Sequence, residues 1–387
     1  MNVVELVAHR VEVPLKRAIK HASHARTSTA NVVVRCVLDD GTVGHGEGVP
    51  RDYVTGETAE SSLALLASAG LRAQLHPATT FEEAVGIASR ITMPPVPGDA
   101  RGINGNAARC AAELAYLDAA GRRFKRPLSD ATALVAPTIH EPRAEVRYSG
   151  IITSSRGLKL RALAWVQRWY GFMHLKVKVG IAGQDDVKRL KLVRWWAGGA
   201  MDLRIDANEA WTPAEAVARL KELEPFGITS AEQPVAHESL SCLAQLRREC
   251  ETPIMLDESL CGMIDAERAI GEGLCDLFNL RLSKCGGFIP SLRLAARAKE
   301  AGLACQLGCQ VGETAILSAA GRHFAASVGG LRYVEGSYDG WLVREALGTR
   351  PITFGRGGAA PALPGGGLGV DIDAAALARI TTAKSVL

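Results

Sequence analysis

From about Ala144 onward, the sequence repeats a single unit, a short β-branched run followed by an amphipathic helical stretch. Each run except the last is followed by such a helix-like stretch. Strands in a repeat of this kind lie parallel, because the helix carries the chain back to the start of the sheet. The sequence therefore predicts an α/β fold in which a parallel sheet closes into a (β/α) barrel. The eight runs are VRYSGII, HLKVKVG, DLRIDANEAW, ITSAEQPV, PIMLDESL, LFNLRLSKCGG, ACQLGCQVGE and LRYVEGS.

The first third of the chain follows a different pattern. Two β-rich stretches, VVELVAHRVEVPL and NVVVRCVLDDGTVGHGEG, precede helical stretches such as ARCAAELAYLDAAGRRF. Strands followed by helices predict a separate α+β unit, which we place at residues 1–125, with the barrel at 126–349. The remaining tail, 350–387, is rich in Gly and Pro, and we expect it to fold back onto the N-terminal unit.

Composition narrows the class of protein. Of 387 residues, 47% are hydrophobic and 22% charged, which is enough to bury a large core. The net charge of +4 comes from scattered basic residues, so we expect no nucleic-acid partner. The charged N-terminus and the lack of long apolar runs predict neither a signal peptide nor a membrane segment. Nine cysteines without a CxxC pair suggest reduced thiols and a cytoplasmic location.

One charged residue stands near the end of each central run, before the loop. Lys178 is followed by Asp206 after 28 residues, Glu232 after a further 26, Asp257 after 25 and Lys284 after 27. This near-constant interval matches the strand–helix repeat, so we expect all five side chains at a similar height in the barrel. Active sites of such barrels lie at the C-terminal ends of the strands.

The residue types indicate a particular chemistry. Asp206, Glu232 and Asp257 would repel one another in a barrel mouth, so we expect a hard divalent cation between them. Oxygen ligands suit Mg²⁺, with Mn²⁺ as an alternative. A substrate carboxylate bound to the metal becomes acidic at its α-carbon, because the metal stabilises the enediolate. Lys178 and Lys284 would lie on opposite sides, where one removes the α-proton and the other returns it.

The stretch HLKVKVG carries two lysines on one face of a strand, because side chains alternate. A solvated edge strand would also show this pattern. In a site, like-charge proximity and partial burial lower the pKa of a lysine, toward about 7–8, where it acts as a general base. We expect Lys178 to be the base, and Lys176 to be a neighbouring positive charge that helps to hold the substrate carboxylate.

These motifs resemble the enolase superfamily, specifically its muconate lactonizing enzyme subgroup. The resemblance rests on the K-x-K of Lys176 and Lys178, the DAN from Asp206, the EQP from Glu232, the DE at Asp257 and LSKCGG around Lys284. It covers nearly the whole chain and includes the ending PGGGLGVDID. The resemblance implies a modified (β/α)7β TIM-type barrel with an α+β N-terminal capping domain, Mg²⁺ held by the three acids, and a homo-oligomer.

The resemblance implies an isomerase that abstracts the proton α to a carboxylate of a small substrate. Racemisation or epimerisation of amino-acid or dipeptide derivatives ranks first, and cycloisomerisation of a muconate-like diacid second. β-Elimination of water ranks third, and a barrel that binds acids without catalysis is the remaining alternative. Dipeptide epimerases carry Asp-x-Asp on the last strand, where this chain has Ser337 and Asp339. The candidate substrate contacts are Asn208, Glu258, Gln310, Asp339, His24 and Arg26.

Overall fold

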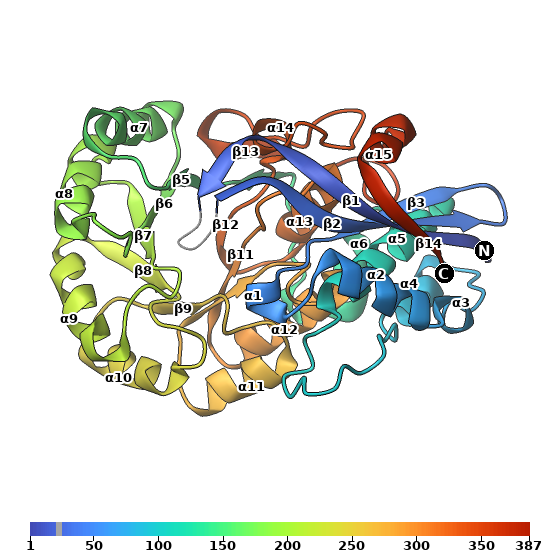
Figure 1. The fold of residues 1–387 in the computed structure, drawn as a ribbon, viewed down its shortest axis with the longest axis horizontal. Helices are drawn as coiled ribbons and strands as arrows, with labels where there is room; N and C mark the ends of the chain where they lie inside the picture. Colours follow the sequence, from blue (N-terminus) through green and yellow to red (C-terminus); the bar gives the residue numbers. More distant parts are fainter. Residues whose placement is uncertain (21–24) are drawn as a thin grey trace.

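A closed parallel sheet forms the larger part of the molecule. The structure, a computed structural model, describes residues 1–20 and 25–387. Eight strands pair in sequence order from β5 to β12 (Figure 1). The Ser149 N–H beside β5 donates to the Val334 carbonyl of β12 at 2.8 Å, which joins the two ends of the sheet. The predicted barrel is confirmed. Its strands are β5 (Gly150–Ile152), β6 (His174–Lys178), β7 (Asp202–Asp206), β8 (Ile228–Glu232), β9 (Ile254–Leu256), β10 (Leu277–Leu280), β11 (Ala304–Leu307) and β12 (Leu331–Val334).

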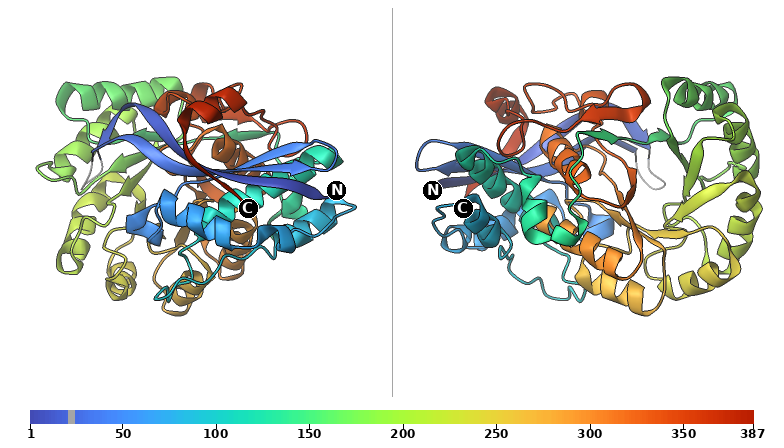
Figure 2. Two further views of the ribbon diagram at one scale, coloured as in Figure 1. Left: turned by 45° about the vertical axis from the view of Figure 1, so that its right-hand side comes forward. Right: turned by 180° about the vertical axis from the view of Figure 1, so that it is seen from behind.

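A main helix follows each of the first seven barrel strands, and these helices surround the sheet (Figure 2). Directly after β12 the chain forms a short helix, α14 (Asp339–Leu342), in place of an eighth main barrel helix, so the repeat is (β/α)7β. None of the helices formed by residues 1–20 and 25–387 has the length and apolar character needed to span a bilayer. The barrel helices are α7 (Gly157–Tyr170), α8 (Asp186–Ala197), α9 (Pro213–Leu223), α10 (Leu243–Glu249), α11 (Met263–Gly271), α12 (Phe288–Glu300) and α13 (Ala315–Ser327).

A second, antiparallel sheet forms the core of the capping domain, in the order β14-β1-β2-β3. Strand β14 comes from the C-terminal tail and pairs with β1, which brings the two chain ends together (Figure 1). The predicted boundaries at residues 125 and 349 stay predictions. The elements are β1 (Val3–Lys20), β2 (Ala25–Leu38), β3 (Val43–Gly48), α1 (Asp52–Thr55), α2 (Ala59–Ser68), α3 (Leu71–Gln74), α4 (Phe81–Ala88), α5 (Asn106–Phe124), α6 (Asp130–Val135), α15 (Ala374–Ile380) and β14 (Thr381–Val386).

A small antiparallel pair links the barrel entrance to the tail. Strand β4 (Glu145–Arg147) pairs with β13 (Ala359–Pro361), just before the first barrel strand. Strand β1 of the β1–β2 hairpin also reaches the barrel, because the Arg344 N–H donates to the Pro14 carbonyl at 2.8 Å. The hairpin is thereby held against the loop that follows β12.

Strand β3 packs against helix α5 without side chains between them. Its three alternate residues Gly44, Gly46 and Gly48 face the helix, and a Cβ at Gly46 would lie 2.0 Å from the Ala111 carbonyl oxygen. The alternating glycines in VGHGEG therefore allow backbone-to-backbone contact with the alanine-rich face of α5.

Two buried carboxylates of the capping domain attach it to the barrel. Glu47 of β3 accepts hydrogen bonds from Thr314 N–H and Leu317 N–H at the start of α13. Glu113 of α5 accepts from Phe288 N–H at 2.5 Å, at the start of α12. A carboxylate at a helix N-terminus satisfies free N–H groups and complements the helix dipole. Both helices follow strands whose ends form the site described next.

Candidate active site

Three acidic side chains meet at the C-terminal ends of consecutive strands. Asp206 is the last residue of β7, Glu232 the last of β8, and Asp257 directly follows β9. Asp206 and Glu232 are register partners across β7 and β8. All three side chains are buried. The structure thus places the three predicted ligands together on one edge of the sheet.

The acids perturb one another's ionisation. Burial and the neighbouring Asp206 carboxylate raise the pKa of Glu232 to about 7. Burial also opposes ionisation of Asp206, but Lys178 and Lys176 outweigh it and hold its pKa well below the usual range. Burial acts likewise on Asp257, whose pKa the neighbouring cations lower below the ordinary value. The carboxylates therefore share one electrostatic environment that requires positive charge.

Lys176 lies inside the barrel among these acids. Its Nζ is 2.9 Å from Glu335 Oε2, 3.1 Å from Glu232 Oε2 and 3.3 Å from Asp206 Oδ2. Burial disfavours the charged amine, but the acids outweigh it and raise the pKa of Lys176 well above the ordinary value. This direction is opposite to the lowering expected for a lysine of the pair. The amine is engaged with protein carboxylates rather than directed toward a substrate.

Lys178 lies at the end of the same strand and is more accessible. Its side chain is 26% exposed, and its Nζ is 3.5 Å from Asp206 Oδ2. The amine also donates to Asn208 Oδ1. Asn208 takes a left-handed backbone conformation, with φ of 44°, in the loop after β7. Lys178 is therefore an amine at the barrel mouth, beside the acidic group, where a substrate could reach it.

Lys284 has a different environment from the one expected of a proton donor. Its side chain is 1% exposed, and its Nζ donates to the backbone carbonyls of Asp257 at 2.6 Å and Asn279 at 2.9 Å. It also forms an ion pair with Asp257 Oδ1 at 2.8 Å. Burial acts against the charge, but Asp257 outweighs it and raises the pKa of Lys284. The amine is close to a metal-ligand candidate but turned into the backbone.

Arg281 is a site residue that the sequence interpretation missed. It directly follows β10 and its guanidinium contacts Asp257 Oδ2 and lies 3.7 Å from Glu232 Oε1. Asn279, two residues earlier, donates to Glu232 Oε1 at 2.8 Å. Because strand side chains alternate, Asn279 and Arg281 share the inward face. This alternation is the sequence pattern from which Arg281 could have been predicted as a residue of the site.

Two further buried residues close the charge network beneath the acids. Glu335, directly after β12, forms an ion pair with Arg204 of β7 as well as with Lys176. The Arg204 guanidinium lies over the Tyr333 ring, 4.5 Å from its centroid, and donates to Ser149 Oγ at 3.2 Å. Glu335 is thus fully engaged by protein cations.

The three carboxylates are of the chemical type that binds a hard cation. Asp206 Oδ2 is buried and accepts no hydrogen bond within the described residues, although it forms ion pairs with the Lys176 and Lys178 amines at 3.3 and 3.5 Å. Carboxylate oxygens are the ligands that Mg²⁺ prefers. In the described part of the chain, however, no three His, Cys, Asp or Glu side chains are spaced to bind a metal ion. Lys176 and Arg281 contact the same acids and neutralise them.

The candidate substrate contacts divide into two groups. Asn208 contacts Lys178, and Glu258 is buried beside Asp257, with burial and that neighbour raising its pKa to about 8. Glu258 Oε2 and Gln310 Oε1 are buried without hydrogen-bond partners among the residues described. These three side chains lie near the acids or offer unused polar atoms.

The other candidates lie elsewhere. Asp339 is buried and accepts from the Ile352 N–H at 2.9 Å, so it supports the C-terminal segment. Arg26 belongs to β2 of the capping domain and lies over the Tyr53 ring, 5.3 Å from its centroid. His24 lies outside the described residues.

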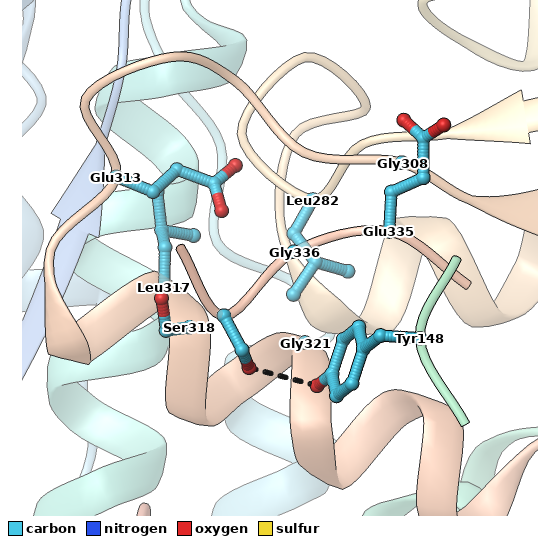
Figure 3. A pocket seen from close by; sticks show the side chains of 10 residues that line it. Tyr148, Leu282, Gly308, Glu313, Leu317, Ser318, Gly321, Glu335 and Gly336 are labelled. Carbon is cyan, nitrogen blue, oxygen red and sulfur yellow. Dashed lines mark hydrogen bonds between the residues drawn. The ribbon is translucent and has the colours of Figure 1, made fainter. Parts of the chain in front are cut away.

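Two hollows flank this arrangement. One is lined by the ends of β10 to β12 and by α13, with Glu313, Ser318, Glu335 and Tyr148 around it (Figure 3). The Tyr148 hydroxyl accepts a hydrogen bond from Ser337 Oγ at 2.9 Å. The other lies between residues 52–56 and 97–104 of the N-terminal portion and the loop at His237 after β8.

Comparison with known proteins adds independent information. Residues 159–376 match the family described as "Enolase C-terminal domain-like". Residues 3–131 match the N-terminal domain of the mandelate racemase / muconate lactonizing enzyme family. Together these matches cover both the barrel and the capping domain.

The similar proteins include a racemase, a cycloisomerase and a dipeptide epimerase. The chain is 29% identical over 328 residues to an N-succinyl-L-Arg/Lys racemase of Bacillus cereus, covering 84% of this chain and 85% of that protein. It is 28% identical to a chloromuconate cycloisomerase of Cupriavidus pinatubonensis, covering 97% of each. A crystal structure of a dipeptide epimerase from Cytophaga hutchinsonii, complexed with Mg and D-Ala-L-Val, superposes with a TM-score of 0.84 at 26% identity, over 100% of both chains.

Proposed function

The chain belongs to the enolase superfamily, in the mandelate racemase / muconate lactonizing enzyme family, and is an isomerase; from this premise we propose that it removes the proton α to a substrate carboxylate with Lys178 as base. One observation carries the proposal. The Lys178 amine is part-exposed at the end of β6, 3.5 Å from Asp206, beside acids on the next three strands. A base must lie within reach of the substrate proton, and Lys178 is accessible at the mouth.

We assign Mg²⁺, with Mn²⁺ as an alternative, to Asp206, Glu232 and Asp257. The bound cation would withdraw charge from the substrate carboxylate and so acidify the α-carbon. Lys178 then takes the α-proton onto Nζ, and Asn208 holds the amine in place through its Oδ1. Unpartnered oxygens of Glu258 and Gln310 are available to donors of the substrate.

Two reaction types divide this proposal. The racemases and epimerases among the relatives suggest N-succinylamino acids or dipeptides as substrates, with exchange of the α-proton between faces. The cycloisomerase suggests a muconate-like diacid that closes to a lactone. Both reactions transfer a proton to or from the carbon α to a substrate carboxylate. The homo-oligomeric state and the cytoplasmic location stay predictions.

The test is proton exchange in ²H₂O with added Mg²⁺, using N-succinyl-L-arginine, L-Ala-L-Glu and 2-chloro-cis,cis-muconate as probes. We expect at least one probe to acquire deuterium at the α-carbon. Lys178→Met should lower that rate by about 10³-fold, since a positioned base contributes about 10²–10⁴. Lys188→Met is the matched control, because that lysine is 82% exposed on α8. Equal rates in parent and Lys178→Met would refute the assignment of the base.

A further inference from the structure

The Lys284 amine has no capacity left for proton transfer to a substrate. An ammonium group has three N–H donors. Those of Lys284 face the Asp257 carbonyl at 2.6 Å, the Asn279 carbonyl at 2.9 Å and Asp257 Oδ1 at 2.8 Å. The side chain is 1% exposed. Delivering a proton would break this buried set of hydrogen bonds, so Lys284 holds the β9 and β10 ends together instead.

Arg281 stands where a second amine would be needed. It is the first residue after β10 and shares the inward face with Asn279. Its guanidinium contacts Asp257 and is 16% exposed, whereas the Lys284 side chain, three residues later, is 1% exposed. Arginine does not lose its proton in proteins. It therefore supplies fixed positive charge without exchanging protons.

The barrel places Arg281 across from Lys178. Strands β6 and β10 are four positions apart in the ring of eight, which puts their ends on opposite walls. We propose that the site has a single proton-transferring amine, Lys178, and that Arg281 faces it as a fixed cation, so that a proton is exchanged on only one face of the α-carbon. This inference rests on the proposed function, because it takes Lys178 as the base.

One-sided exchange separates the two reaction types. Racemisation breaks a C–H bond on one face and forms it on the other, so it requires a proton donor on the second wall. Ring closure of an unsaturated dicarboxylate does not. There, a carboxylate oxygen forms a C–O bond to one alkene carbon, and the π pair shifts toward the other carboxylate. The carbon α to that carboxylate then uses this electron pair to take a proton from the Lys178 ammonium. Water reprotonates the amine. The site therefore favours an unsaturated diacid that closes to a lactone.

The stereochemical course of exchange tests this directly. The Mg²⁺-loaded protein is incubated in ²H₂O with the three probes named above, and the products are followed by NMR and chiral chromatography. We expect α-deuterium on one face only, either in the chloromuconate lactone or in an N-acylamino acid or dipeptide that keeps its configuration. Arg281→Lys adds an amine on the second wall and should raise inversion by about 10²-fold. Arg281→Met should not.

A second measurement does not depend on turnover. Amine acetylation of the metal-free parent, mapped by mass spectrometry, should label Lys178 while Lys284 stays unlabelled. Equal labelling of the two would overturn the inference even if Arg281→Lys failed to fold. Inversion by the parent would overturn the inference alone and leave the proposed function standing. Absence of exchange with every probe would overturn both.

Discussion

Glu113 couples the capping domain to the barrel, and its ionisation should be visible in the stability of the whole chain. The side chain is buried on α5 and accepts from Phe288 N–H and Ile289 N–H at the start of α12. Burial raises its pKa from 4.5 to about 7, although Arg109 and the two N–H groups act in the other direction. We predict that Glu113→Gln changes how the free energy of unfolding depends on pH.

The magnitude follows from the shift. A rise from 4.5 to about 7 corresponds to about 3 kcal/mol, because one pKa unit is about 1.4 kcal/mol. The folded state holds its proton more tightly than the unfolded state. The stabilising contribution of this proton is therefore fully present below pH 4.5 and is lost as the pH rises through about 7. Glutamine does not titrate, so Glu113→Gln lacks this loss.

Urea unfolding of parent and variant at several values between about pH 5 and 8 measures the difference. Relative to the parent, Glu113→Gln should gain most of the 3 kcal/mol as the pH rises across that window. Glu300→Gln, at a side chain that is 68% exposed on α12, is the control. Its free energy of unfolding should change with pH in the same way as that of the parent. If the free energy of unfolding of Glu113→Gln has the same pH dependence as that of the parent, the pKa of the buried Glu113 carboxyl is not raised and the reasoning is wrong.

Two further predictions concern the charges inside the barrel. Glu335→Gln removes the acid between Lys176 and Arg204 and leaves two buried cations short of a partner. Urea unfolding should show a loss of about 3–5 kcal/mol, and an unchanged midpoint would contradict it. Mg²⁺ should raise the melting temperature of the parent, because a ligand that binds only the folded state stabilises it. Asp206→Asn should abolish that rise in a thermal-shift assay, and an equal rise in this variant would argue against Asp206 as a ligand.

The barrel could be predicted because the strand–helix repeat is visible in the sequence as a regular alternation of short apolar runs and amphipathic stretches. Each strand is a short apolar run, and each is separated from the next by a helix of similar length, so the repeat survives uncertainty about any single boundary. The acids were predictable for the same reason. Asp206 and Glu232 are each the last residue of a strand, and Asp257 directly follows one, so a shift of one residue in a boundary does not move them from the barrel mouth.

The second cation was not predictable from the interval alone. Arg281 and Lys284 follow Asp257 by 24 and 27 residues, and both fit the strand–helix repeat. The difference arises where β10 ends at Leu280. After that point the backbone turns, with the Cys285 N–H donating to the Arg281 carbonyl at 2.9 Å, and the Lys284 amine donates to the Asp257 backbone carbonyl. A turn directly after a strand redirects side chains in a way that the spacing of charges does not record.

Basic side chains beside the three metal-ligand candidates determine how strongly a metal would be needed to neutralise them. A carboxylate buried without a counter-charge is strongly unfavourable, and three in one place are more so. In this barrel Lys176 contacts Asp206 and Glu232, and Arg281 contacts Asp257. The protein's own cations therefore supply neutralising charge to the acids in the folded structure. Mg²⁺ would have to compete with them for the acids, so we expect it to stabilise the folded chain modestly rather than to be required for folding.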